Sequence, residues 1–255
     1  MRLRRLGHGE QAELVEHLGE LRTRLIVSLL AVGVGFGVAY AFHGTLLHWL
    51  NGPLPAERSR PVTFGVTEPF MTSFKVSLYA GFALALPVVL WQLWAFLAPA
   101  FQQNVQRTLA TSVAAASALF ALGVGFGYRV VLGPAVHFLT TYDSHLYDIQ
   151  IRASSYYSFV LMVLVAVGIV FELPVFMLAL VRLRVVSSAT LRRKRRLGYV
   201  LVAALAVALP GIDPVTTTLE MVPMLVLFEG SIWLSVLLER RLVRAARARA
   251  VELAA

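Results

Sequence analysis

The sequence predicts an all-α polytopic integral membrane protein that crosses the bilayer six times, with both termini in the cytoplasm. Three observations support this fold class. The 255-residue chain is 58% hydrophobic with a mean hydropathy of +0.73, which is too apolar for a soluble domain. Its apolar residues gather into six stretches separated by polar segments. Its net charge of +9 is concentrated on one side of the topology that six spans define.

The six apolar stretches differ in length. They cover residues 25–42, 76–98, 109–128, 156–181, 197–209 and 219–238. The first four can cross a hydrocarbon core of about 30 Å, whereas the fifth has only about 13 residues and the sixth contains Glu229. We therefore expect the last two helices to be short and the bilayer beside them to be thinner. The expected domains are a cytoplasmic amphipathic leader at 1–24, a six-helix transmembrane domain at 25–238 and a basic cytoplasmic tail at 239–255.

Basic residues give the orientation. With six spans, the side that carries both termini holds every Lys and Arg except five, and such an excess marks the cytoplasmic side. The five on the outer side are Arg58, Arg60, Lys75, Arg129 and Arg152. Orientation and lipid contact explain the pI of about 10.5, so the charge does not call for nucleic-acid binding.

Polar segments flank the spans. Residues 10–25 carry leucines at helical spacing, which is typical of an amphipathic helix at the cytoplasmic interface. The first apolar stretch starts late and is of spanning length, which indicates no cleavable signal peptide. The segment 129–155 is predicted to be an outer loop, and Tyr142, Tyr147, Tyr156 and Tyr157 suit the outer interface. The segment 51–75 is predicted to be an ordered, non-helical outer cap because of its prolines. They are Pro53, Pro55, Pro61 and Pro69.

Two glycine patterns predict close helix packing. Gly33 and Gly37 in the first stretch, and Gly123 and Gly127 in the third, each form a G-x-x-x-G pair. Small residues at this spacing let two helices approach closely. We interpret both pairs as packing contacts and not as parts of a repeat.

Glu172 interrupts the apolar run 159–181. It lies ten residues before Arg182, so at 1.5 Å per residue it is about 15 Å deep, near the middle of the bilayer. A carboxyl group there costs on the order of 3 kcal/mol unless it is protonated, paired or hydrated, which makes it a candidate functional residue. The other interpretation is a protonated acid bonded to a neighbouring helix. Pro174 is expected to kink this helix. Glu229 is expected to be a second buried carboxyl, and Gly230 beside it is expected to allow close packing.

The two carboxyl groups are also compatible with two other functional classes of membrane protein, a transporter and an enzyme. A proton-coupled small-solute transporter could use Glu172 and Glu229 as a relay. An intramembrane enzyme is not expected, because the chain has no G-x-S-G site, no paired intramembrane aspartates and no H-E-x-x-H motif. The histidines have no metal-ligand spacing, and the absence of cysteine excludes disulfides, so neither a metal nor a cofactor is expected.

Several longer motifs occur in order along the chain. They are HLGELRTRL at 17–25, TEPFMTSFKVSLYAGFALALPVVLWQLWAFLAPAF at 67–101, FELPVF at 171–176, LRRKRRLGYVLVAAL at 191–205, LPGIDP at 209–214 and VPMLVLFE at 222–229. With these motifs the sequence resembles the TatC family, the multi-spanning core subunits of the twin-arginine protein translocase, over nearly its whole length.

The resemblance implies a function and a set of partners. The chain would be a receptor and scaffold that binds Arg-Arg signal peptides of folded precursors at the cytoplasmic face. It would assemble single-span TatA/TatB-type subunits for export driven by the proton-motive force, as a homo-oligomer within the translocase. It would be a multi-pass protein in contact with lipid in the cytoplasmic (inner) membrane of a prokaryote, with a concave groove around Glu172.

The resemblance also implies signal-peptide-binding residues. Glu20 matches a family carboxylate that suits guanidinium binding, and Arg22 matches its neighbouring arginine. Phe96 and Pro99 match the corner after the second span. The residues themselves allow a plainer interpretation of Glu20, an i,i+4 surface pair with Arg24 worth about 0.3–0.5 kcal/mol.

The chain departs from the family in the loop after Pro99. The family places a second carboxylate where this chain has Val105, and no acidic residue occurs in Ala98–Arg107. Gln103 and Gln106 can accept hydrogen bonds from guanidinium but carry no charge. Replacing a charge-assisted contact by a neutral one costs about 1–2 kcal/mol, or roughly tenfold in affinity, so we expect weaker or relocated twin-arginine recognition.

Three residues on the outer side complete the predicted sites. Pro53 belongs to the outer cap, and Asp213 and Thr217 match outer-side positions of the family that are structural or contact partners. Thr217 stands where the family usually has Gln. Asp213 beside Pro214 also suits an ordinary Asx-type turn cap, and both interpretations stay open.

Overall fold

The computed structural model describes residues 8–56, 60–97, 105–182, 185–209 and 213–254. Within these ranges the elements are helical, apart from an isolated parallel bridge between Val62 and Arg152, which confirms the all-α class. The elements are α1 (His8–Ala41), α2 (His43–Leu50), α3 (Glu68–Leu97), α4 (Val105–Phe126), the π-helical turn η3 (Gly127–Val131), α5 (Leu132–Thr141), α6 (Ala153–Val170), α7 (Leu173–Arg182), α8 (Ser188–Arg193), α9 (Arg195–Ala208) and α10 (Pro214–Ala254).

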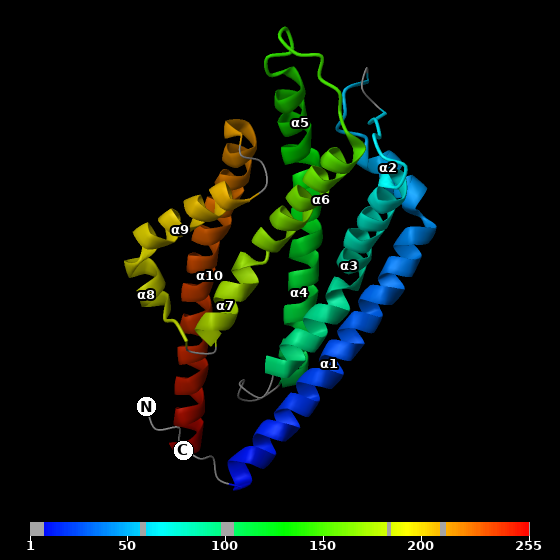
Figure 1. Cartoon of the computed structure of the whole chain (residues 1–255). Helices are drawn as coiled ribbons and strands as arrows, with labels where there is room; N and C mark the ends of the chain where they lie inside the picture. Colours follow the sequence, from blue (N-terminus) through cyan, green and yellow to red (C-terminus); the bar gives the residue numbers. More distant parts are fainter. Residues whose placement is uncertain (1–7, 57–59, 98–104, 183–184, 210–212, 255) are drawn as a thin grey trace, which may run out of the picture.

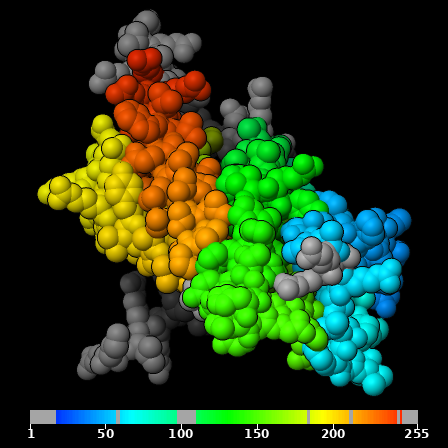
Figure 2. All heavy atoms as spheres, turned by 90° about the horizontal axis from the view of Figure 1, so that it is seen from above, coloured from blue at the N-terminus to red at the C-terminus, as the bar shows by residue number. Residues whose placement is uncertain are grey.

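The helices form a bundle with two distinct ends (Figure 1). Helix α1 begins and α10 ends at the same end of the molecule, here called the inner end; α2 and α5 lie at the opposite, outer end. Seen from the outer end, α1 and α3 lie on one side of the α4–α5 column, and α8, α9 and α10 lie on the other (Figure 2). Contacts of α6 with α3 and α4, and of α10 with α7, join the two sides.

Five helical segments of the described chain are long and apolar enough to cross a membrane, so the protein is a multi-pass membrane protein. They are Leu18–Ala41, Glu68–Phe96, Ala110–Thr141, Ala153–Arg182 and Pro214–Arg241. The fifth apolar stretch forms α9, whose 14 residues extend about 21 Å. It is as short as expected, but the prediction is wrong for the last helix, because the sixth stretch lies in the 28-residue span Pro214–Arg241 of α10. The count of six spans and the cytoplasmic location of the termini stay predictions.

Both predicted outer loops are shorter than expected. Helix α3 begins at Glu68, so the proline-rich cap ends before it, and Pro69 sits in the first turn, where its missing N–H leaves no bond unmade. The prediction that 129–155 is a loop is wrong as far as Thr141, because η3 and α5 are helical there. Leu132 and Val136 lie one turn apart and are both buried, and this apolar face holds α5 against the bundle.

The first glycine prediction is wrong in detail. A Cβ on Gly33 or Gly37 would meet no atom within 4 Å, whereas one on Gly35 would collide with the backbone of Gly81 in α3. The close approach of α1 and α3 therefore depends on Gly35 and Gly81. The second prediction is confirmed for α4 and α6: Gly123 packs on Gly168 and Phe171, and Gly127 packs on Leu164 and Val167.

Two tyrosines placed at the outer interface are instead part of the core. Tyr156 and Tyr157 are 6% and 7% exposed. Their hydroxyl groups donate to Leu50 O and to Asn51 Oδ1, each at 2.7 Å, which is why they can be buried. These bonds join α6 to the turn after α2, and Pro53 lies in that same turn.

The described parts of the predicted leader and tail belong to helices of the bundle. From His8 on, the leader is part of α1, which runs without a break into the first span. As far as Ala254, the basic tail is part of α10, which has 41 residues. The boundaries proposed at residues 24 and 238 therefore fall inside helices.

Candidate functional site

The predicted signal-peptide carboxylate lies near the inner end of α1. Glu20 accepts a hydrogen bond from Arg24 Nε at 2.9 Å, one turn further along the helix. Arg24 also donates through Nη1 to Gln92 Oε1 of α3 at 3.3 Å. The i,i+4 pair expected from the sequence is therefore present, and it ties α1 to α3. The carboxylate is half-buried and already positioned to receive a guanidinium.

The other predicted peptide-binding residues surround the same end of the molecule. Arg22 is exposed on α1, and Phe96 is half-buried in the last turn of α3. Pro99 and Gln103 lie outside the described residues. Gln106 belongs to the first turn of α4, but its side chain also lies outside the described part.

Glu172 marks a break between two helices. Helix α6 ends at Val170 and α7 begins at Leu173, because Pro174 has no N–H to continue the ladder. The predicted kink is thus confirmed as a full interruption. The Glu172 side chain is half-buried, and its Oε1 atom has no hydrogen-bond partner among the described residues. A bond to a neighbouring helix, the plainer interpretation, is therefore not formed through this atom.

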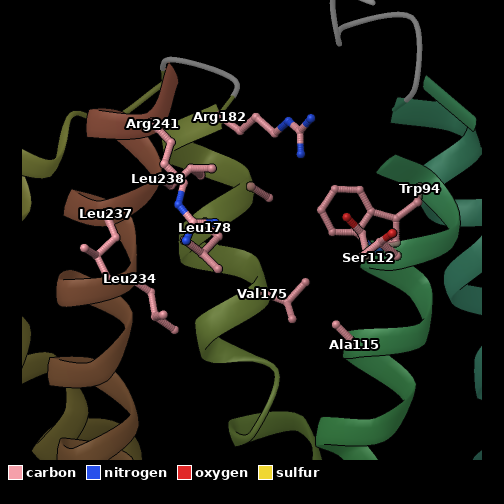
Figure 3. Close-up of a pocket in the computed structure, with 12 residues that line it drawn as sticks. Trp94, Ser112, Ala115, Val175, Leu178, Arg182, Leu234, Leu237, Leu238 and Arg241 are labelled. Atoms are coloured by element: carbon pink, nitrogen blue, oxygen red, sulfur yellow. The ribbon is translucent and has the colours of Figure 1, made fainter. Parts of the chain in front are cut away.

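A cavity of about 340 Å³ opens between α3, α4, α7 and α10 towards the inner end. Figure 3 shows Trp94 and Ser112 on one wall, facing Val175 and Leu178 of α7 on the other. Val175 follows Glu172 by three residues, so the cavity begins about one helical turn from the carboxyl group. Glu172 is not among the residues that line this cavity, so the groove expected around Glu172 stays a prediction.

Glu229 differs from what its position in an apolar run suggests. Its carboxylate accepts a hydrogen bond from Tyr199 and lies 3.3 Å from Arg195 Nη2, both on α9. It is therefore a paired group between α9 and α10 and not an isolated buried acid. The prediction that Gly230 packs closely is also wrong, because nothing lies within 4 Å of a Cβ there.

Asp213 caps the start of α10. Its Oδ1 accepts from the backbone N–H groups of Val215 at 3.1 Å and Thr216 at 2.8 Å, which confirms the turn-cap interpretation. Thr217 is half-buried in the first turn of the same helix. A contact of these residues with a partner stays a prediction.

Sequence reasoning missed a fully buried carboxyl group. Glu220 is 1% exposed, and neither of its carboxyl oxygens has a hydrogen-bond partner in the described part of the chain. It lies within the sixth apolar stretch, 219–238, where the sequence interpretation names only Glu229. Helical spacing could have identified it, because Asp213, Thr216 and Glu220 share one face once the helix begins at Pro214.

Taken together, these features define the class: a multi-pass helical membrane protein with a carboxylate at its inner end and a broken span beside an apolar cavity. Residues 16–223 match the family model of "Sec-independent protein translocase protein (TatC)". The chain belongs to the TatC family.

Individual members of the family are similar in sequence to this chain over most of its length. A TatC protein of Carboxydothermus hydrogenoformans is 34% identical over 223 residues, covering 87% of this chain and 92% of that protein. A chloroplastic TATC of Arabidopsis thaliana is also 34% identical, covering 88% of this chain and 66% of that protein. A crystal structure titled "Twin Arginine Translocase Receptor- TatC in DDM" superposes with a TM-score of 0.76 at 33% identity, covering 86% of this chain and 99% of that one.

Proposed function

We propose that this chain is the receptor and scaffold subunit of a twin-arginine translocase in the inner membrane of a prokaryote. The observation that carries the proposal is the Glu20 carboxylate at the inner end, which holds the guanidinium of Arg24. A guanidinium of an Arg-Arg signal peptide can exchange with Arg24 on this carboxylate. The relatives named above are translocase proteins, and that agrees with such a role.

The apolar part of the signal peptide has a path beside this carboxylate. Phe96 lies in the last turn of α3 at the same end, and the cavity between α3, α4, α7 and α10 leads from there towards Glu172. Its walls carry apolar side chains such as Val175, Leu178 and Leu234. We therefore place the twin arginines at Glu20 and the apolar segment along the groove, with Glu172 at its deep end.

Single-span partners of the TatA/TatB type dock on the opposite side of the bundle in this proposal. Helices α9 and α10 form an open groove of about 680 Å³ there, lined by Ala203, Met221 and Leu225 with Glu229 at one end. An apolar helix covers such a surface well, and the short α9 makes the bilayer thin beside it. The proton-motive force then drives transport through the assembled complex.

The transporter alternative has less support. Its relay needs two titratable carboxyl groups, and Glu229 is held in an ion pair with Arg195 and bonded to Tyr199. We therefore keep the receptor as the proposed function.

Site-specific crosslinking tests the proposal. A photoreactive residue is placed at positions 20, 96 and 102–106 in turn, and a twin-arginine precursor is added to membranes that contain the translocase. We expect adducts at position 20 and at position 96, and none at Phe64, an outer residue that is 70% exposed. Silence at all the inner positions would remove the receptor assignment.

A second variant tests the missing loop carboxylate. Val105→Glu restores a charge at the start of α4, and we expect it to improve discrimination of an Arg-Arg peptide over a Lys-Lys peptide by roughly tenfold. The matched neutral control is Val105→Gln. Equal discrimination by both variants would show that a carboxylate at this position contributes nothing to recognition.

A further inference from the structure

The cavity at the inner end has an unusual distribution of charge for a peptide groove. Arg182 of α7 and Arg241 of α10 are both among its lining residues. Figure 3 shows the Arg182 side chain extending towards Trp94 at one end of the cavity, and the Arg241 side chain running down the wall beside Leu178. Two guanidinium groups that line one cavity create a positive potential in it.

Both arginines lie where membrane-spanning segments end. Arg182 is the last residue of the span Ala153–Arg182, and Arg241 is the last residue of Pro214–Arg241. This is the level of the lipid headgroups, where arginine side chains and tryptophans such as Trp94 are commonly found. The opening of the cavity is therefore placed among phosphate groups.

The rest of the cavity extends from this level into the apolar layer. Val175 lies seven residues before Arg182, and Leu234 lies seven residues before Arg241. Seven helical residues span about 10 Å, so both walls reach about 10 Å below the arginines. Between these limits the walls present Leu178 and Leu237, so apolar wall continues into the bilayer from the two guanidinium groups, and we call this apolar part of the cavity the slot.

We propose that this cavity binds an anionic phospholipid of the inner leaflet, with its phosphate between Arg182 and Arg241 and the upper part of one acyl chain in the slot. The volume of about 340 Å³ lies within the range of pockets that hold small ligands. Guanidinium groups bind phosphate through paired, charge-assisted hydrogen bonds. A zwitterionic lipid has the same tail but brings its own cation to the opening, so the site selects anionic lipid.

The charge also distinguishes this ligand from a signal peptide. Twin arginines would meet two like charges at the opening, which disfavours their entry there and leaves them to Glu20. The lipid site needs no part of the receptor role, because lipid binding is measured without a precursor. A bound lipid would have to leave, or move aside, when an apolar segment enters the groove.

The experiment uses the full chain in detergent with phosphatidylglycerol as the probe and phosphatidylcholine as the comparison, and it measures lipid affinity by native mass spectrometry. The variant Arg182→Gln/Arg241→Gln removes both guanidinium groups. One basic residue contributes about fivefold to the attraction of an anionic lipid surface, so we expect about 25-fold weaker binding of phosphatidylglycerol. Phosphatidylcholine affinity is expected to stay as in the wild type.

The matched control is Arg196→Gln/Arg240→Gln, which removes the same charge from exposed residues outside the cavity lining. We expect it to bind phosphatidylglycerol like the wild type; an equal loss would show non-specific charge attraction and overturn the site. A second variant, Leu237→Trp, fills the slot and keeps both arginines, and it should also weaken binding. It provides the test if the double glutamine variant does not fold.

Two further measurements distinguish an anionic lipid from inorganic phosphate and from a zwitterionic lipid as the ligand of this site. Inorganic phosphate at the same concentration as the lipid should leave lipid binding unchanged, because it has no acyl chain to fill the slot. Displacement by phosphate at that concentration would reduce the site to an anion site and overturn the proposal. Equal affinity for the two lipids would overturn it as well, since the arginines would then select nothing.

Discussion

Glu68 and Glu220 are both buried carboxyl groups, 7% and 1% exposed, but their surroundings are opposite. Glu68 accepts hydrogen bonds from Arg152 Nε at 2.9 Å and from the backbone N–H groups of Phe64 at 3.0 Å and Ser154 at 3.1 Å. Glu220 accepts none from any described residue. A satisfied carboxylate joins two segments, whereas an unsatisfied one costs stability.

The same contrast extends to the regions around them. The outer cap is held to α6 by Glu68, by the bridge of Val62 with Arg152 and by Tyr156 and Tyr157. The carboxylate of Glu68 also raises the pKa of Arg152 by bonding to its charged form. On the other side, Glu172 and Glu220 have unpartnered oxygens. The hydrogen bonds of the outer cap stabilise it against α6. The carboxyl groups of Glu172 and Glu220 contribute no such bonds through their unpartnered oxygens, so a stabilising role does not explain them.

The largest effect is expected from Glu68→Ala. The change leaves Arg152 and two backbone N–H groups without their acceptor, and it removes one of the links between the cap and α6. Thermal unfolding in detergent should show the greatest fall in melting temperature of the variants considered. Asp148→Ala, at an exposed outer position, is the control and should melt like the wild type. An unchanged melting temperature for Glu68→Ala would remove the contrast between the two regions.

Glu220→Leu should change stability in the opposite direction and stabilise the protein. Replacing a buried, unpartnered carboxyl by an apolar side chain removes a desolvation cost, so we expect the free energy of unfolding to rise by about 1–3 kcal/mol. The control is Glu229→Leu, which breaks the ion pair with Arg195 and should not stabilise. Stabilisation by both variants, or by neither, would contradict the distinction drawn between them.

Glu172→Gln separates stability from function. The amide has nearly the volume of the acid and replaces a group with an unpartnered oxygen, so the free energy of unfolding should change by less than about 0.5 kcal/mol. Export of a twin-arginine precursor from cells, measured by fractionation, should nevertheless fall. Normal export with this variant would assign Glu172 to the neutral, structural interpretation.

The smallest effect is expected from Arg24→Gln. The i,i+4 pair with Glu20 contributes only about 0.3–0.5 kcal/mol, so the melting curve should barely move. Release of Glu20 from its internal partner should strengthen binding of an Arg-Arg peptide. Weaker binding would indicate that Arg24 positions Glu20 and does not compete with the ligand.

The sequence predicts those features of this fold that depend on local chemistry. The helical spans follow from the apolar stretches, the break at Glu172 follows from Pro174, and the cap at Asp213 follows from Asx-turn chemistry. In the predicted site, local chemistry also gives the pair of Glu20 with Arg24.

Tertiary contacts account for what the sequence does not predict. Gly35 and not Gly33 meets α3, because the helix rotation is set by packing against Gly81. Tyr156 and Tyr157 are buried because acceptors more than a hundred residues earlier come within hydrogen-bond distance. Arg182 and Arg241 line the same cavity because α7 packs against α10, and no local sequence pattern predicts that packing.

Peptide binding tests the central claim, recognition of twin arginines at Glu20, most directly. The affinity of a labelled Arg-Arg signal peptide is compared with that of its Lys-Lys counterpart, for the wild type, for Glu20→Gln and for the control Glu229→Gln on the other side of the bundle. We predict that the wild type and the control prefer Arg-Arg and that Glu20→Gln loses roughly tenfold of that preference. An undiminished preference in Glu20→Gln would contradict the account.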